Sequence, residues 1–457
     1  MAHVRTLILG GGMSGLSCAY HLKSDYQLLE KSDEPGGLSR SIKQDGFVFD
    51  HTGHLLHLRN PYTLDLIPKL LGNNIVKNVR NAWIYSSGTY TRYPFQANTY
   101  GLPKRVIEEC IKGLVDAQLK NPSPSPLPGG EGNLKKAPSP SGRGSKGEGV
   151  PESLRHWVLR TFGRGFGKYF FFPYNEKLWT VSSDVLTAEW VAPFVPKPSI
   201  SEAVEGAFSD RTQQYGYNAT FLYPREGGIQ SLAFAIAEPL AKERLRLKQE
   251  VKAVDLNKKQ VTTASGETIS YDFLVTSLPL IRFLSMTGNL PPEAARAAKQ
   301  LRWTSVYNLN LGVQRSRLTD KHWVYFPEKK YIFYRVGFPM NFSDKMTPPG
   351  CSSMYIEIAY TPGHPPDDKK ALQSCLQGLY DCGLVDRKDK IISQLLLHIP
   401  IAYVIFDKNR TAATRTLLSY LQSQNVYSIG RFGAWKYSYM EEAILEGKAT
   451  AETIDGQ

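Results

Sequence analysis

Three glycines near the N-terminus have the spacing of a phosphate-binding turn. Gly10, Gly12 and Gly15 form the pattern G-x-G-x-x-G, directly after the apolar run "HVRTLIL" and at the start of a helical pattern. The first glycine permits a tight turn, the second lets the backbone approach a pyrophosphate, and the third lets helix and strand pack closely. The N-terminus of the helix adds a positive field. The spacing therefore predicts a site for a dinucleotide.

A carboxylate and a second glycine turn narrow the choice of dinucleotide. Glu30 ends the next expected strand, in "YQLLEK", where a carboxylate can accept hydrogen bonds from a ribose diol. This favours an adenosine without a 2′-phosphate. The pair Gly36 and Gly37 follows in "EKSDEPGGLSRS", which resembles the segment where FAD proteins of the amine-oxidase type wrap the pyrophosphate a second time. The dinucleotide is therefore predicted to be FAD rather than NAD.

The elements that must position these residues lie at both ends of the chain. Residues 4–31 read strand, glycine turn, helix and strand, which is a βαβ start. The final block, from residue 426, reads strand, glycine-rich turn and helix. Between them lie a helical, aromatic-rich stretch after residue 150 and strand-like stretches over 303–360. We expect an α/β fold with a discontinuous Rossmann-like FAD-binding domain, an inserted helical domain and an antiparallel β-sheet substrate domain.

The expected domain boundaries follow from this order. The FAD-binding domain takes residues 1–92, 226–299 and 411–457, the helical domain residues 93–190, and the substrate domain residues 191–225 and 300–410. Within the helical domain, residues 121–150 consist almost wholly of Pro, Gly, Ser and charged residues. Such a segment buries too little apolar surface to offset its ordering, so we expect a disordered insertion. A Pro-rich docking segment for a partner is the alternative.

Composition limits the classes of partner. The net charge of the 457 residues is +13, but lysine and arginine are scattered and form no block typical of nucleic-acid binding. We expect a basic cleft for a small anionic substrate, no nucleic acid, and at most a peripheral contact with a membrane. No apolar run approaches the ~20 residues of a membrane helix, and no secretory leader is visible. Five cysteines without metal-pair spacing predict no metal site and a cytoplasmic location.

Five further stretches resemble one family within the flavoprotein superfamily that also holds protoporphyrinogen oxidases and phytoene desaturases. They are "TGHLLH" (52–57), "YPFQ" (93–96), "PYNEKLW" (173–179), "FYR" (333–335) and "GRFGAWKY" (430–437). In this order they are similar to UDP-galactopyranose mutase, especially its eukaryotic-type branch. The resemblance runs from residue 7 to residue 454, and only the insertion at 121–150 has no counterpart.

The resemblance assigns roles to particular residues. It implies that His54 lies against the reactive edge of the flavin and that Arg335 grips the substrate pyrophosphate, which makes these the candidate catalytic residues. The other candidate substrate-binding residues are Tyr93, Phe95, Gln96, Asn175, Trp179, Tyr334, Arg410 and Tyr437. The candidate cofactor-binding residues are Gly10, Gly12, Ser14, Gly15, Glu30, Lys31, Gly37, Leu38, Ser39, Val251, Gly430, Arg431 and Met440.

Departures from the family pattern concern the phosphate contacts. The family has a second pyrophosphate arginine four residues after the second tryptophan of a W…W pair, and Trp179 and Trp190 have this spacing, but Phe194 takes the place of the arginine. The family's phosphate-binding tyrosine after an F-D pair is here Arg410. We hypothesise that Arg410 restores the lost charge at a new angle. A lost charge-assisted contact costs about 1.5–3 kcal/mol, enough to change the substrate.

The resemblance also implies a reaction. Reduced FAD attacks the anomeric carbon of a nucleotide-linked sugar through N5 as UDP leaves, and the sugar ring then opens and recloses as a furanose. NAD(P)H is the expected reductant. One alternative is an FAD-dependent oxidoreductase of the protoporphyrinogen-oxidase or amine-oxidase type, which removes a hydride from a small substrate. A second alternative is an FAD-stabilised scaffold without enzymatic activity.

Several site residues have purely structural alternatives. Tyr93 and Phe95 are also compatible with core aromatic residues beside a proline. Trp179 and Trp190 lie at a spacing that would let them pack helices together. For Arg335, between aromatic residues in an expected strand, the alternative is a surface ion pair.

Overall fold

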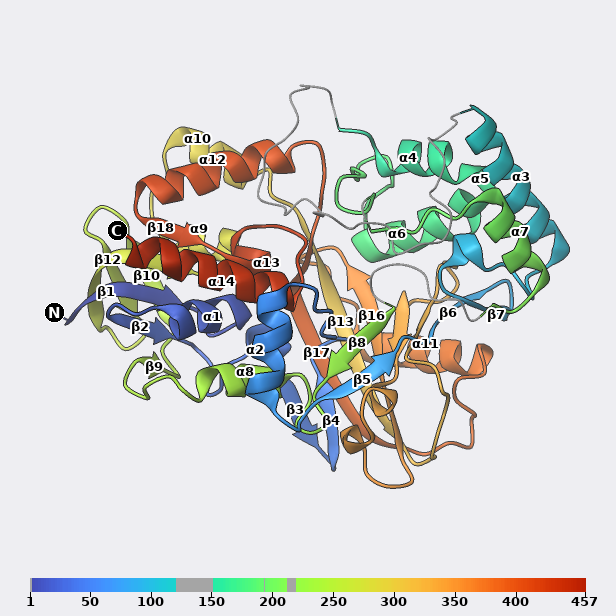
Figure 1. The fold of residues 1–457 in the computed structure, drawn as a ribbon, viewed down its shortest axis with the longest axis horizontal. Helices are drawn as coiled ribbons and strands as arrows, with labels where there is room; N and C mark the ends of the chain where they lie inside the picture. The colour runs from blue at the N-terminus through green and yellow to red at the C-terminus, as the bar shows by residue number, and fades with distance from the viewer. Residues whose placement is uncertain (1, 121–150, 193, 212–218) are drawn as a thin grey trace.

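Two seven-stranded sheets organise the chain, each with its own helices (Figure 1). The computed structural model describes residues 2–120, 151–192, 194–211 and 219–457. The predicted disordered insertion at 121–150 lies outside the described residues. Strands from the two ends of the chain lie in one sheet, and helices from both ends pack against it. The predicted discontinuous α/β fold is therefore confirmed.

The first sheet contains the N-terminal strand in its interior. Its strands are β10 (Val251–Asp255), β11 (Gln260–Thr263), β12 (Thr268–Thr276), β1 (Ala2–Leu9), β2 (Tyr26–Leu29) and β9 (Leu245–Arg246), in this spatial order, with β18 (Val426–Ser428) also paired to β12. β1 pairs in parallel with β12 on one side and β2 on the other. β10, β11 and β12 pair antiparallel. The short parallel strands β1, β2, β12 and β18 thus place their carboxyl ends at one edge of the sheet.

Helices cover both faces of the first sheet. Since successive residues of β1 point to opposite faces, neighbouring side chains of this strand pack against different helices. On one face, buried Ile8 belongs to a core with α1 (Met13–His21), α2 (Pro61–Leu71), α8 (Gln230–Ala237) and α14 (Met440–Asp455). On the other face, Leu7 and Leu9 belong to a core with α9 (Leu280–Met286), α10 (Pro292–Ala298) and α12 (Arg410–Ser423). The short helix α13 (Gly430–Gly433) follows β18.

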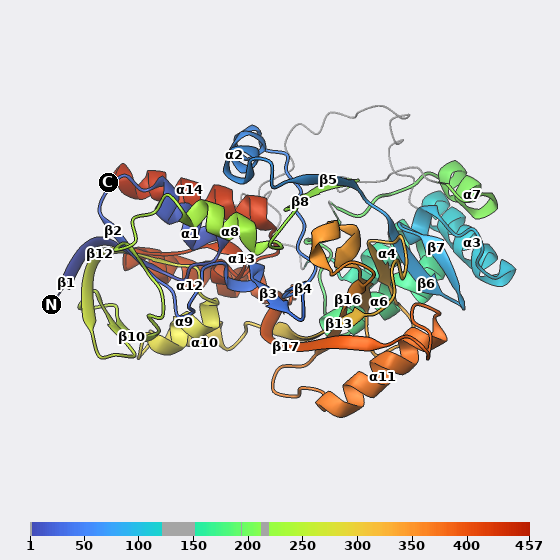
Figure 2. The same ribbon diagram turned by 90° about the horizontal axis from the view of Figure 1, so that it is seen from below.

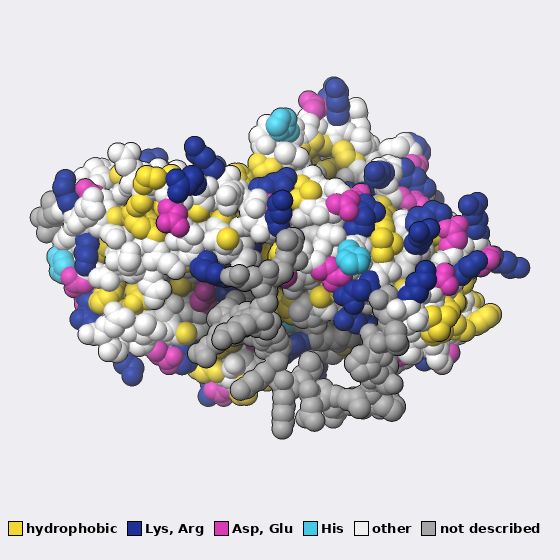
Figure 3. Space-filling model, turned by 90° about the horizontal axis from the view of Figure 1, so that it is seen from above, with side chains coloured by type: hydrophobic (Ala, Val, Ile, Leu, Met, Phe, Trp, Pro, Cys, Tyr) yellow, Lys and Arg dark blue, Asp and Glu magenta, His cyan; other side chains and the backbone are white. Residues whose placement is uncertain are grey.

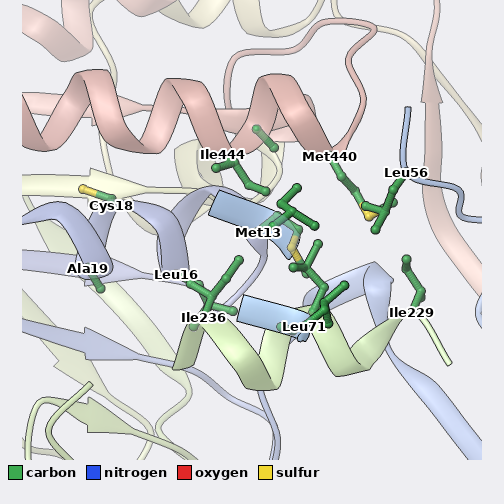
Figure 4. Packing of buried hydrophobic residues seen from close by; sticks show 14 of the residues in the cluster. Met13, Leu16, Cys18, Ala19, Leu56, Leu71, Ile229, Ile236, Met440 and Ile444 are labelled. Atoms are coloured by element: carbon green, nitrogen blue, oxygen red, sulfur yellow. The ribbon is translucent and has the colours of Figure 1, made fainter. Parts of the chain in front are cut away.

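The core beneath α14 joins the start of the chain to its end. Figure 4 shows Met13 and Leu16 of α1 among the side chains of Ile236 from α8 and Met440 from α14. The helices α1 and α14 also approach closely at Gly447, where an added Cβ would lie 2.5 Å from the carbonyl oxygen of Ser14. The packing therefore brings the last helix onto the helix of the first glycine turn.

The second sheet is built mainly from the second half of the chain. Its order is β17 (Ile391–Val404), β13 (Trp303–Val313), β16 (Ser352–Tyr360), β15 (Arg335–Gly337), β14 (Trp323–Tyr325), β6 (Ala82–Ser86) and β7 (Thr89–Arg92). All neighbouring strands are antiparallel except β14 and β6, which run parallel. Residues 82–92, which the predicted division assigns to the FAD-binding domain, are thus strands of this sheet. The predicted domain boundaries otherwise stay predictions.

The two faces of the second sheet meet different helices. The long helix α11 (Asp368–Asp381) covers one face, where Cys375 and Leu379 pack with Leu309 and Ile356 (Figure 2). A helical group takes part in a core with Val306, on the other side of β13. This group contains α3 (Lys104–Lys120), α4 (Leu154–Thr161), α5 (Gly163–Phe166), a π-helical turn (Gly167–Phe171), α6 (Phe172–Trp179) and α7 (Ile200–Phe208).

Two small sheets and several short helical turns complete the fold. β3 (Ser41–Gln44) pairs with β4 (Phe47–Asp50), and β5 (Val76–Val79) pairs with β8 (Thr220–Tyr223). Buried Asp50 ties these two small sheets together, because it accepts hydrogen bonds from Ser41 Oγ at 2.6 Å and Tyr223 OH at 2.5 Å. The 3₁₀ turns are Gly37–Ser39, Phe95–Ala97, Pro339–Asn341 and Asp344–Met346.

The surface carries mixed charges. On the face that Figure 3 shows, lysine and arginine side chains stand among acidic ones rather than in one continuous basic patch. Among the helices of the described residues, none combines the length and the apolar character needed to cross a membrane.

Candidate functional site

The first glycine turn has the close approaches that its spacing predicts. Gly10 has φ +98°, and a Cβ on Gly15 would lie 2.0 Å from the carbonyl oxygen of Gly10. An added Cβ on Gly12 would meet no heavy atom within 4 Å. The residue that caps α1 is Gly12, which has no side chain to accept hydrogen bonds. The first backbone N–H groups of α1 therefore stay available for an anion. This turn fits a pyrophosphate.

The second glycine turn lies directly against the first. The N–H of Gly36 donates to the carbonyl of Gly11 at 2.8 Å, and an added Cβ on Gly37 would lie 3.2 Å from the Cα of Gly12. Gly36 and Gly37 both have positive φ, +130° and +58°. Leu38 is partly buried and Ser39 buried in the 3₁₀ turn that follows. The two glycine segments therefore form one backbone surface, although a gap in sequence separates them.

Glu30 is held at the end of β2 by backbone donors. Its Oε2 accepts the N–H of Gly11 at 2.7 Å and its Oε1 accepts the N–H of Ser32 at 2.9 Å. Each carboxylate oxygen retains a lone pair, which suits the ribose diol of an adenosine. Lys31 beside it is exposed. The segment that leads into Val251 lies beside Glu30, because the N–H of Gln249 donates to the carbonyl of Glu30 at 2.8 Å.

The C-terminal turn closes over the start of α1. Gly430 has φ +79°, and an added Cβ there would lie 2.3 Å from Ser14 Oγ. Arg431 donates from Nη1 to the carbonyl of Ser438 at 2.7 Å, which ties the turn across to the start of α14 at Met440. The structure thus brings together the predicted cofactor residues of both chain ends.

His54 lies in the loop after β4 and is partly buried. Its Nδ1 is 3.3 Å from the Thr52 hydroxyl and 3.3 Å from the Thr52 carbonyl oxygen. Burial, together with the positive charges of Arg431 and Arg335, lowers the pKa of His54 to about 4. The imidazole is therefore neutral at pH 7. It can exchange hydrogen bonds there without carrying charge.

Arg335 makes a bidentate ion pair rather than standing free. Its Nη2 donates to Glu357 Oε1 at 2.8 Å, and its Nε donates to the other carboxylate oxygen. Glu357 is fully buried on β16, and 19% of the Arg335 side chain is exposed. Burial opposes the charge, but the Glu357 carboxylate holds the pKa of Arg335 well above its ordinary value. Arg335 thus forms an ion pair, but a buried one and not the surface pair of the structural alternative. The pair orients the remaining guanidinium donors.

Seven tyrosines lie around this arginine, around Arg431 or against one another, and sequence reasoning found only some of them. Tyr93, Tyr334 and Tyr437 were predicted. The structure adds Tyr174, Tyr325, Tyr355 and Tyr403. The guanidinium of Arg335 lies 5.8 Å from the Tyr355 ring centre and 6.0 Å from that of Tyr334. The missed tyrosines come from four separate elements or their flanks, and no spacing in the sequence links them.

The tyrosine cluster, formed by the seven tyrosines just named, contacts a second arginine. Arg431 lies 4.9 Å from the ring centre of Tyr437 and 5.3 Å from that of Tyr403. Tyr93 and Tyr325 are in ring contact at 5.5 Å, and Tyr174 contacts Tyr325 at 5.3 Å. Burial raises the pKa of each of Tyr93, Tyr174, Tyr325 and Tyr403, so these phenols stay protonated and can donate hydrogen bonds. Two arginines and several phenol donors make a site suited to an anion.

Phe95 and Gln96, predicted to bind the base of a nucleotide, lie inside the helical core. Phe95 has no exposed surface and stacks on Phe170 at 5.3 Å. Gln96 donates from Nε2 to the carbonyl of Pro196 at 2.8 Å. Asn175 donates from Nδ2 to the carbonyl of Phe171 at 2.8 Å. In this arrangement Phe95 packs as a core aromatic residue, which is the structural alternative for it.

Trp179 packs against Trp190 with ring centres 4.7 Å apart. Within the described residues, neither indole N–H has a hydrogen-bond partner, although both are buried. Trp190 also lies 5.7 Å from Tyr437, which connects the pair to the tyrosine cluster. Buried donors without acceptors are costly, so two such donors beside the cluster favour an acceptor-rich ligand there.

Arg410 supports the C-terminal turn. Its Nε donates to the carbonyl of Trp435 at 3.0 Å, and Nη2 donates to the same oxygen. The guanidinium lies 4.5 Å from the ring centre of Phe406. Burial lowers its pKa to about 10, with Glu189 opposing this shift. Arg410 thus holds Trp435, a residue with φ +50°, two positions before Tyr437.

Comparisons with known proteins agree with this architecture. Residues 13–455 match the model of a family described as flavin-containing amine oxidoreductase. The solved structure of reduced UDP-galactopyranose mutase is similar over 99% of this chain and 96% of that chain, with a TM-score of 0.88 and 26% sequence identity. Putrescine oxidase bound to putrescine matches over 100% and 99% of the two chains, with a TM-score of 0.64 and 15% identity. A fatty acid isomerase from P. acnes matches over 98% of both chains, with a TM-score of 0.64 and 13% identity. The last two share the fold.

Proposed function

Because the chain belongs to the family of flavin-containing amine oxidoreductases, we propose that it is an FAD-dependent enzyme that binds a nucleotide-linked sugar and interconverts its pyranose and furanose forms. The flavin is the family's cofactor. The structural similarity to UDP-galactopyranose mutase supports the choice of substrate class. The reductant in this proposal is NAD(P)H.

The observation that carries the proposal is the arginine and tyrosine cluster next to His54. Arg335 and Arg431 provide guanidinium donors, and their charges add to the effect of burial, the largest cause of the lowered pKa of His54. Tyr437 and Tyr403 lie against Arg431. A diphosphate needs this combination of guanidinium and hydroxyl donors, because its charge must be neutralised as it leaves. An alkylamine is a cation at pH 7, so a site with two arginines favours an anion over an amine.

The chain's own residues have distinct tasks in this proposal. Arg335, oriented by Glu357, and Tyr437 hold the pyrophosphate of the substrate. The indole N–H groups of Trp179 and Trp190 donate to it or to the adjoining nucleoside. Neutral His54 exchanges a hydrogen bond at the edge of the cofactor. Reduced flavin, when bound, supplies the nucleophile that displaces the nucleoside diphosphate from the sugar. Phe95 and Gln96 support the site from the helical core.

The proposed cofactor is FAD, not a mononucleotide. The open space at Gly12 and the adjacent turn at Gly36–Gly37 fit a pyrophosphate, and the free lone pairs of Glu30 fit an adenosine ribose. Heat-released flavin from the purified protein, separated by chromatography, identifies it. Release of a flavin mononucleotide would contradict this part of the proposal.

The test uses flavin-loaded protein reduced with NADH, NADPH or dithionite. Titration with UDP should change the flavin absorbance spectrum. Incubation with UDP-galactose, UDP-glucose and other nucleotide sugars should produce an isomer of equal mass with a new retention time, without consumption of an electron acceptor. If neither UDP nor any of these sugars changes the flavin spectrum, the proposed substrate class is wrong.

A second candidate is an FAD-dependent oxidoreductase that removes a hydride from a small substrate. The family match favours it, because the family is described by its amine oxidoreductase activity. Under this candidate, a substrate alone bleaches the oxidised flavin under anaerobic conditions. A panel of amines and porphyrinogens tests it in parallel, and bleaching by one of them without any response to UDP would decide in its favour.

A further inference from the structure

Lys177 is a half-buried lysine whose hydrogen bonds all go to backbone carbonyls. It lies on α6, and its Nζ donates to the carbonyl of Phe326 at 2.7 Å, that of Glu328 at 2.5 Å and that of Phe333 at 3.2 Å. No ion pair of Lys177 occurs within the part of the chain that the structure describes. Burial lowers its pKa to about 7, with Glu328 opposing the shift. The function described so far makes no use of this costly group.

The three acceptors belong to one segment, residues 326–334, which connects β14 to β15. Tyr325 precedes this segment, and Tyr334 and Arg335 stand at its end. Lys177 therefore bonds to two carbonyls near the start of the connection and to one near its end. The protonated amine has three N–H donors, one for each of these carbonyls, and a charged donor forms stronger hydrogen bonds than a neutral one. Because the pKa of Lys177 is about 7, the restriction of the segment by these hydrogen bonds is complete only below pH 7.

The same face of α6 contacts the tyrosines on either side of this segment. Tyr174, one turn before Lys177, lies 5.3 Å from the ring centre of Tyr325 and 6.3 Å from that of Tyr334. Residues three apart on a helix lie on one face. The helix α6 thus holds the segment by its carbonyls and the flanking rings by an aromatic contact.

We propose that Lys177 is a positioning residue, whose ammonium group holds segment 326–334 so that Tyr334 and Arg335 present their side chains to the substrate. This inference rests on the proposed function for the identity of the ligand. The segment's attachment to α6 can be measured without any ligand. The partner that Lys177 acts through is the backbone, so its loss should reach the substrate only by way of Arg335 and Tyr334.

The first experiment measures hydrogen exchange in the full-length, flavin-loaded protein. Lys177→Met keeps an unbranched side chain, shorter by the terminal nitrogen, and removes its donors. Peptides that cover residues 326–335 should exchange faster in this variant, while peptides from β1 and α14 should not change. Lys330→Met is the matched control, because Lys330 lies in the same segment but is exposed and pairs with Glu328. Unchanged exchange over 326–335 in Lys177→Met would overturn the proposal.

The second experiment measures UDP affinity from the flavin spectrum. Lys177→Met should raise the Kd for UDP about tenfold, since small displacements of a binding group cost this much or more, with the flavin content unchanged. Lys177→Arg, which keeps a charged donor, should recover part of the affinity, and Lys330→Met should bind as the wild type does. Faster exchange with unchanged UDP affinity would also overturn the positioning role.

The two readouts separate failure of this inference from failure of the proposed function. If the wild-type protein does not bind UDP, the proposed function fails, and the exchange experiment still decides whether Lys177 holds the segment. If Lys177→Met does not fold with flavin, Lys177→Gln takes its place, because its amide can donate to fewer carbonyls. If residues 326–335 of Lys177→Gln exchange at the same rate as in the wild-type protein, the proposal is overturned. Faster exchange supports it.

Discussion

Replacement of Glu357 by glutamine tests the central feature of the site, the buried pair with Arg335. Glu357 is fully buried and 19% of the Arg335 side chain is exposed, so water screens the pair weakly. Removal of one partner from a buried ion pair leaves an uncompensated charge and costs about 3–5 kcal/mol. Glutamine keeps one carbonyl acceptor for the guanidinium. We therefore expect the lower end, about 3 kcal/mol, for Glu357→Gln.

Urea unfolding of the flavin-loaded protein, followed by tyrosine and tryptophan fluorescence, measures the cost. The matched control is Glu152→Gln. Glu152 also forms a bidentate pair, with Arg160 at 3.0 and 2.8 Å, but 29% of the Glu152 side chain and 43% of the Arg160 side chain are exposed. An exposed pair contributes about 0.2–1 kcal/mol. Glu152 also lies 3.3 Å from His156 Nδ1, so the difference between the two variants gives a lower limit for the effect of burial on a bidentate pair.

A double-mutant cycle with Arg335→Met shows whether the cost comes from the pair itself. Arg335→Met leaves the Glu357 carboxylate buried without its partner, so it should destabilise the protein as well. The double variant should be more stable than the sum of the two losses predicts, with a coupling energy of about 1–3 kcal/mol. If Glu357→Gln costs no more than Glu152→Gln, or if the two losses simply add, the reasoning on the buried pair is refuted.

Three further predictions concern the glycine turn, the histidine and the second arginine. Gly15→Ala should lose its flavin and also lower the free energy of unfolding by about 1–3 kcal/mol or more, because the added Cβ meets the carbonyl of Gly10. Gly12→Ala should lose flavin without this loss of stability. Absorbance measures the flavin content, and urea unfolding measures the stability. The pKa of His54 lies below its unfolded value of 6.5, at about 4, so its contribution to stability is complete above pH 6.5 and is lost as pH falls toward 4. His54→Asn should therefore flatten the pH dependence of unfolding between pH 7 and 5, and an unchanged profile would contradict the shift. Arg410→Met should weaken UDP binding about tenfold, because the turn at Trp435 loses charge-assisted hydrogen bonds; unchanged binding in a spectral titration would show that the turn does not need them.

The glycine turns could be predicted because their constraints are local. Gly10, Gly36 and Gly430 adopt positive φ, and glycine does so readily because it has no Cβ. Their spacing relative to strand and helix patterns marks where a backbone must turn sharply. The contact between Gly36 and the first turn could be expected only from the resemblance, because it depends on how two loops meet across the sheet edge.

The substrate side was predicted less completely. The motif "FYR" pointed to Arg335, but its partner Glu357 lies on another strand, 22 residues later in the sequence. The register between β15 and β16 sets this pair opposite each other. Phe95 was predicted to contact a base, and the structure buries it against Phe170. A motif indicates which residue type recurs at a place, not which side of the backbone that side chain faces.

The amino-acid sequence by itself determined the phosphate-binding turns and the alternation of strands and helices at both chain ends, because each depends on backbone conformation or on periodicity within a short stretch. The flavin family was indicated by the resemblance of several motifs taken in order. Only the tertiary structure decided which tyrosines surround Arg335 and which carboxylate pairs with it. Only the structure shows, too, that Lys177 bonds to segment 326–334, which directly precedes Arg335. These contacts join residues from separate strands and helices. Strand register and helix packing bring them together, and neither is written in the spacing of any single motif.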